Sequence, residues 1–174
     1  MRKVMYLMGA LEDSDVEWLG DNGSTVRLTR NQVLVTEGQP VDYLFIVLDG
    51  QLSVNAGSTR LATLLTGEVI GEISFVDSRP PLATVTALDN ARVLAVKRDV
   101  LKAKLASDSR FAANFYRAIA IFLADRLRAT TSRLGYGKPG QDAEPDELDE
   151  LSEDLLETVS LGTRRFDNLL KKVS

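Results

Sequence analysis

Residues 25–97 break into eight short runs of β-type residues, and turn residues separate the runs. The runs read TVRLT, VLVT, YLFIVL, QLSV, LATLL, EVI, ATVTA and ARVLAV. Most gaps hold glycine, asparagine or aspartate, which favour tight turns. Most gaps are also too short for the crossover connections that parallel strands need. The pattern therefore predicts a mainly β fold, with antiparallel strands arranged as a barrel or jelly roll.

Helical patterns flank the predicted strands. Before them, residues 10–20 read as a short helix closed by Gly20. After residue 98 the apolar period changes from two to about 3.6, which indicates helices over residues 98–106 and 109–134.

The longer of these two helices carries two apolar stripes. The first is suited to packing on the barrel and consists of Phe111, Phe115, Ala118 and Phe122. The second recurs at alternating spacings of four and three and consists of Tyr116, Ala120, Leu123, Leu127, Thr130 and Leu134. Such spacing is typical of a helix that pairs with another helix, so we expect a homodimer. The alternative is that both stripes are buried within one monomer.

The C-terminal part of the chain begins with a stretch rich in glycine, proline and charge, which predicts a linker over residues 135–146. Residues 147–174 then read as an amphipathic helix, acidic early and basic late, with Gly162 weakening its middle. A helix of this kind suits a protein partner or an oligomer contact, and docking on its own domain is the alternative.

Composition excludes several classes of function. The chain has no cysteine and no histidine, which removes disulfides, Ser-His and Cys-His catalysis and imidazole-bound metals. No apolar stretch is long enough to insert in a membrane, and the N-terminal residues do not resemble a secretory signal, so we expect a cytoplasmic protein. The net charge is −4, but nine of the 25 acidic residues lie in residues 141–157. The remainder has no concentrated Lys/Arg stripe, which argues against a nucleic-acid partner.

The stretch GEISFVDSRPPLATV, residues 71–85, carries the most specific signal. Gly71 and Glu72 end one strand and lead into residues 73–76, which suit a single helical turn. The backbone N–H groups of such a turn can receive a phosphate, while the carboxylate of Glu72 can accept a sugar hydroxyl. A ribose cyclic phosphate meets both demands.

Three segments, EGQPVDYLFIVLDGQLSV, TGEVIGEISF and PLATV, resemble the cyclic nucleotide-binding domain family, typified by the catabolite activator proteins and the regulatory subunits of the cAMP-dependent kinase. The resemblance covers about residues 5–134. It implies an eight-stranded β-roll of jelly-roll topology over residues 24–97, flanked by helices, within one domain of residues 1–134. It also implies cAMP or cGMP as the ligand, with no other cofactor and no metal.

The resemblance further implies a ligand site. Glu72 would bind the ribose, and the backbone of Ile73, Ser74, Leu82 and Ala83 would face the cyclic phosphate. Residues of the long helix would meet the purine. The candidate ligand-binding set is Gly71, Glu72, Ile73, Ser74, Arg79, Pro81, Leu82, Ala83, Thr84, Thr130 and Thr131.

Pro81 departs from the family pattern, because members that bind cAMP carry an arginine at this position. Proline donates no hydrogen bond, and losing a charge-assisted one costs about 1.5–3 kcal/mol. Arg79 either swings into the pocket as a substitute or points to solvent. Arg126 and Arg128 either reach over a ligand or stay on a solvated helix face. Glu72 itself has an alternative role, bonding the N–H groups of its own turn.

Two functions remain open from the sequence. The first is a non-enzymatic sensor that binds a cyclic nucleotide or a related anion and signals through helix movement. The second is a degenerate member that binds no nucleotide and acts as a dimeric adaptor. The absence of histidine argues against a cupin enzyme, and a single C-terminal helix argues against a transcription factor of the catabolite activator type.

Overall fold

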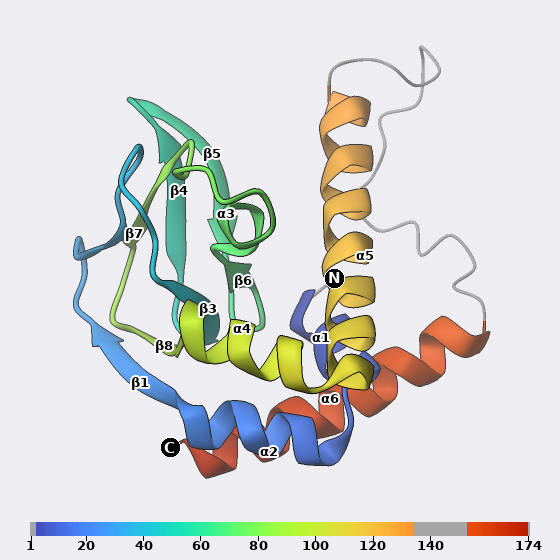
Figure 1. Ribbon diagram of the computed structural model, residues 1–174. Coiled ribbons are helices and arrows are strands. Elements are labelled where there is room, and N and C mark those ends of the chain that lie inside the picture. Colours follow the sequence, from blue (N-terminus) through green and yellow to red (C-terminus); the bar gives the residue numbers. More distant parts are fainter. Residues whose placement is uncertain (1–2, 134–152, 174) are drawn as a thin grey trace.

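The computed structural model describes residues 3–133 and 153–173, and eight strands form a roll on one side of the helices (Figure 1). The strands form two antiparallel sheets, in the orders β1-β8-β3-β6 and β2-β7-β4-β5. Their bounds are β1 Gly23–Leu28, β2 Val33–Val35, β3 Tyr43–Asp49, β4 Leu52–Ala56, β5 Thr59–Leu64, β6 Val69–Ile70, β7 Thr84–Ala87 and β8 Ala91–Lys97. Each of the eight predicted runs overlaps one strand, so the predicted fold class is confirmed.

Strands β3 and β8 form the centre of the first sheet and are buried on both faces. Val93 and Ala95 point into the roll, whereas Leu94 and Val96 pack against the helices. Burial on both faces explains why these two runs are almost continuously apolar instead of alternating. The chain therefore has two apolar clusters, one inside the roll and one between the roll and the helices.

Six helices lie in the described part of the chain. Their bounds are α1 Lys3–Ala10, α2 Asp13–Asn22, α3 Glu72–Asp77, α4 Arg98–Ser107, α5 Ser109–Arg133 and α6 Glu153–Lys172. The three C-terminal to the roll agree with the sequence patterns. Helix α1 was not predicted, because a helix of eight residues has little intrinsic stability and depends on tertiary packing.

The prediction that Gly20 closes the first helix is wrong, because α2 continues to Asn22. Gly20 instead lies against α6: an added Cβ would stand 3.0 Å from the Lys172 side chain and 3.3 Å from that of Leu169. The glycine makes room for a neighbouring helix, which no local pattern discloses.

Helix α6 packs on α1 and α2 at the base of the molecule (Figure 1). Its Phe166 and Leu169 are buried in the shared core. The backbones of α1 and α6 touch at Gly162, where an added Cβ would lie 1.9 Å from the carbonyl oxygen of Met5. The apolar face of α6 is thus covered by the chain's own helices, which was the alternative to a partner-binding role. Any protein partner of α6 would have to use its polar face.

Polar contacts fix α6 in this position. The Arg165 guanidinium donates to the carbonyls of Met8 and Gly9, both at 3.2 Å, and pairs with Asp13 at 2.5 Å. It therefore satisfies carbonyl groups at the C-terminal end of α1, where a cation is favoured. The same hydrogen bond from Arg165 lowers the pKa of Asp13.

The two stripes of α5 have different environments. Phe111, Phe115, Ala118 and Phe122 are all buried, as predicted for the first stripe. Of the second stripe, Tyr116 is 48% exposed and Leu127 is 68% exposed, so these two side chains are not buried within the monomer. Leu134, the predicted linker and residues 147–152 lie outside the described residues, and the side chain of Thr130 is not described. None of the helices described here is both long and apolar enough to cross a membrane.

Candidate functional site

The stretch with the strongest sequence signal forms a tight connection from β6 into α3. Gly71 separates them with a φ of 92°, a left-handed conformation that favours glycine. An added Cβ at Gly71 would also lie 2.9 Å from the carbonyl oxygen of Tyr43. Both the conformation and the close approach require a glycine here, and α3 starts at the next residue.

Two polar side chains of α3 are buried, Glu72 and Ser74, each 4% exposed. Ile73 between them is exposed, and Phe75 belongs to the core between the roll and the helices. A carboxylate removed from solvent at the start of a helix is favoured by the helix dipole. The predicted role of Glu72 in binding a sugar stays a prediction.

The segment that follows α3 is tied to the loop before β3. Gly38 donates its backbone N–H to the carbonyl of Pro81 at 2.9 Å, and Glu37 donates its own to the Thr84 hydroxyl at 3.1 Å. Pro81 thus contributes an acceptor to the loop structure. Leu82, next to it, is 87% exposed, an unusual position for a leucine.

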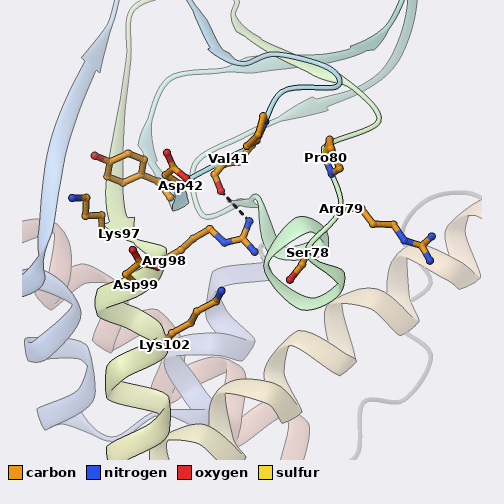
Figure 2. A pocket seen from close by; sticks show the side chains of 11 residues that line it. Val41, Asp42, Ser78, Arg79, Pro80, Lys97, Arg98, Asp99 and Lys102 are labelled. Atoms are coloured by element: carbon orange, nitrogen blue, oxygen red, sulfur yellow. Dashed lines mark hydrogen bonds between the residues drawn. The ribbon is translucent and has the colours of Figure 1, made fainter.

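Arg79 does not take the place left by Pro81. Its side chain is 85% exposed and lies 4.0 Å from the carboxylate of Asp77. Figure 2 shows its guanidinium pointing away from Arg98. Arg79 therefore points to solvent, and its exposed ion pair with Asp77 contributes little to stability.

The structure describes only some of the α5 side chains that were predicted to meet a ligand. Thr131 donates its hydroxyl to the carbonyl of Leu127 in the same helix, at 2.9 Å. Arg128 is exposed, while the side chains of Arg126 and Thr130 lie outside the described set. The ligand roles predicted for these α5 residues therefore stay predictions.

Sequence reasoning missed Arg98, the first residue of α4. Its guanidinium donates to the carbonyl of Val41 at 2.9 Å and to that of Ser74 at 2.5 Å, and it lies 5.5 Å from the centre of the Phe75 ring. The residue thus joins α4 to the end of α3 and to the loop before β3. Its partners are backbone carbonyls 24 and 57 residues away, and such partners leave no side-chain pattern in the sequence.

A chain of aromatic contacts links α3 to the long helix. The rings of Phe75 and Phe115 meet edge to face with their centres 5.7 Å apart, and Phe115 stacks on Phe111 at 5.9 Å. Edge-to-face and offset pairs at such distances are favourable. These contacts connect α3 directly to the N-terminal part of α5.

The pocket next to α3 does not coincide with the predicted ligand set. It has a volume of about 450 Å³ and lies between the end of α3, the loop before β3 and the start of α4 (Figure 2). Of the predicted ligand residues only Arg79 lines it, and Glu72 and Ala83 do not. We therefore treat this pocket separately from the α3 site.

Comparison with known proteins matches this fold. Residues 25–108 match the family model described as "Cyclic nucleotide-binding domain". The crystal structure of the N-terminal domain of a transcriptional regulator from Streptomyces coelicolor A3(2) is 31% identical, with a TM-score of 0.61 over 80% of this chain and 100% of that one. The chain belongs to the cyclic nucleotide-binding domain family. The resemblance noted in the sequence is thereby confirmed.

Other members of the cyclic nucleotide-binding domain family show the same relationship. A CRP-like cAMP-activated global transcriptional regulator of Mycobacterium tuberculosis is 26% identical over 71% of this chain and 56% of that protein. A cyclic nucleotide-binding domain from Methylobacillus flagellatus has the same fold, with a TM-score of 0.67 at 22% identity, over 80% of this chain and 85% of that one. The chain spans about half the length of the M. tuberculosis regulator.

Proposed function

We propose that this cyclic nucleotide-binding domain is a sensor of a small anionic ligand, with cAMP or cGMP as the first candidates. The observation that carries the proposal is the buried carboxylate of Glu72, directly after the left-handed Gly71, at the start of α3. The M. tuberculosis relative, whose name describes it as cAMP-activated, supports the choice of ligand class. The ligand contacts proposed are Glu72 with the sugar and the backbone around Ile73, Leu82 and Ala83 with the phosphate.

The signal would pass from α3 to the long helix. Phe75 packs on Phe115, and Arg98 binds the carbonyl of Ser74, so α3 is coupled both to α5 and to α4. Close-packed interiors do not deform continuously, so a ligand that moves α3 would shift these helices between discrete arrangements. The ligand must bind one arrangement better than the other for this to occur.

The exposed stripe on α5 supports a homodimer, in which the movement of α5 would change the contact between the two copies. Tyr116 and Leu127 are large side chains left in solvent on one helix. A second copy of α5 would remove them from water, and a shift of α5 would then change the contact between the copies.

A second candidate function is a dimeric adaptor that binds no nucleotide. Two observations favour it: Pro81 stands where cAMP-binding members carry an arginine, and Arg79 is turned to solvent. An adaptor would use the same fold and the same α5 surface without any ligand.

Isothermal titration of the full chain with cAMP and cGMP separates the two functions. The variant is Glu72→Gln, which keeps the size of the side chain, and the matched control is Glu17→Gln on the exposed face of α2. We expect saturable binding in the parent and in the control, and about ten- to one-hundredfold weaker binding in Glu72→Gln, as for loss of a hydrogen bond to a charged group. Thermal melts check that each variant folds. No heat from the parent at millimolar ligand would refute the sensor and leave the adaptor.

A further inference from the structure

The pocket between α3 and α4 has no role in the function proposed above. It is lined by Pro40, Val41, Asp42, Tyr43, Ser78, Arg79, Pro80, Lys97, Arg98, Asp99 and Lys102. Its volume of about 450 Å³ is within the range of small-molecule sites. It is distinct from the α3 ligand site, because neither Glu72 nor the Leu82 and Ala83 backbone lines it.

Positive charge dominates the lining. Four cationic residues, Arg79, Lys97, Arg98 and Lys102, and two acidic residues, Asp42 and Asp99, line the pocket, a formal charge of +2. Without Arg79, whose guanidinium points away from Arg98, the formal charge is +1. Arg79 already has Asp77 beside it. Within residues 3–133 and 153–173, neither Lys97 nor Lys102 makes an ion pair or a side-chain hydrogen bond. The pocket therefore holds cationic groups that the fold itself does not neutralise.

The positions of Arg98 and Lys102 in α4 are electrostatically unfavourable. Arg98 and Lys102 are four residues apart, so they share one face of the helix, where like charges repel. They also lie in the first turns of α4, where the helix dipole disfavours cations. Figure 2 shows Lys102 extending from α4 toward Arg98 and Ser78 rather than away from them. An anion between the two side chains would remove this repulsion.

Arg98 retains the donors that such an anion needs. A guanidinium has five N–H groups, and the contacts to Val41, Ser74 and Phe75 engage the two terminal nitrogens. The Nε–H and one N–H of the nitrogen bonded to Val41 remain. These two donors lie on different edges of the guanidinium, so Arg98 offers a phosphate a single charge-assisted hydrogen bond, and a lysine adds a point charge.

We propose that this pocket binds a small phosphate ester of a sugar-like molecule. Its phosphate lies between Arg98 and Lys102, and its hydroxyl groups donate to Asp42 and Asp99. The carboxylates explain why an ester is preferred to a bare phosphate, since they repel a second anionic group but accept hydrogen bonds from hydroxyls. The side chains of Tyr43 and Pro80 supply apolar surface for the organic part.

The test is isothermal titration of the full chain with ribose 5-phosphate and with 5′-AMP, and with ribose and inorganic phosphate as partial probes. The variant is Lys102→Gln, because Arg98 also supports α3 and its loss would disturb the fold. The matched control is Lys171→Gln, which removes an exposed lysine of α6 that does not line the pocket. We expect at least one ester to bind, Lys102→Gln to weaken binding at least tenfold, and Lys171→Gln to leave it unchanged.

Three results would overturn the proposal. No binding of either ester at millimolar concentration excludes the site, and equal binding by Lys102→Gln excludes this location. Inorganic phosphate that binds as tightly as the esters indicates an adventitious anion only. Loss of ester binding in Glu72→Gln would place the ester at the α3 site instead of in this pocket. This outcome concerns the pocket alone, whereas failure of the cAMP titration concerns the proposed sensor.

Discussion

Replacing Gly162 by alanine tests whether α6 is docked as described, because the two possible states of α6 predict opposite signs. In a helix free in solvent, Gly→Ala is stabilising by about 0.5–1 kcal/mol, since glycine has the greater conformational entropy to lose. In the docked helix the new Cβ would lie 1.9 Å from the carbonyl oxygen of Met5 and 2.7 Å from its carbonyl carbon. Both atoms belong to the backbone of α1, so no side-chain rotation relieves the contact.

The size of the effect follows from this overlap. Real Cβ atoms essentially never approach another heavy atom below 3.0 Å, so α1 and α6 would have to separate locally from 1.9 Å to at least that distance. Overpacking of this kind costs about 1–3 kcal/mol, more than the propensity gain. For a chain of this size each kcal/mol of lost stability lowers the midpoint temperature of thermal unfolding by about 2–4 °C. We therefore expect this midpoint to fall by several degrees.

The assay is thermal unfolding followed by circular dichroism, with amide hydrogen exchange in α6 as the local readout. Gly9→Ala should behave alike, because its Cβ would lie 2.1 Å from the carbonyl oxygen of Thr158 on the facing helix. Ser160→Ala, an exposed position of α6, is the matched control and should change the midpoint little. A higher midpoint for Gly162→Ala, with α6 still protected from exchange, would refute the described helix contact.

Three further predictions concern α3, α4 and α5. The pKa of Asp108 is held below its ordinary value, first by the hydrogen bond from the Phe111 N–H and second by the hydrogen bond from the Lys104 ammonium. Replacing Asp108 by asparagine keeps an acceptor for the Phe111 N–H but removes the charge. The resulting stability is present above the unfolded pKa of about 3.9 and is lost as pH falls through the lowered folded value. Urea melts at pH 7, 5 and 3 should therefore show a difference between parent and variant that shrinks at the lowest pH, and parallel curves would contradict this. Arg98→Met should reduce the free energy of unfolding by about 1.5–3 kcal/mol and expose residues 72–78 to faster hydrogen exchange, whereas Lys102→Met should not accelerate that exchange. Leu127→Glu should convert the proposed dimer to a monomer in light scattering at micromolar concentration, and an unchanged mass would argue against the α5 contact.

The sequence by itself determined the strands, the long helix and the place of the α3 connection. Each of these depends on local chemistry that a single sequence displays: β-type runs between turn residues, a change of apolar period after residue 98, and a glycine followed by a carboxylate. Buried Phe111 and Phe115 were recognisable for the same reason, because helical spacing shows which residues share a face. The proposed roles of Glu72 and Pro81 rest on the resemblance to the family, which the sequence also carries.

Only the tertiary structure decided the features that depend on partners distant along the chain. Gly20 and Gly162 read as a helix end and a weak point, yet both lie where another helix passes close to the backbone. Arg98 reads as an ordinary helix start, yet it bonds carbonyls of α3 and of the loop before β3. The cationic pocket likewise gathers residues from three separate segments. Close approach and backbone hydrogen bonding depend on where segments meet in space, and the periodicity of one segment carries no information about which other segment will cover it.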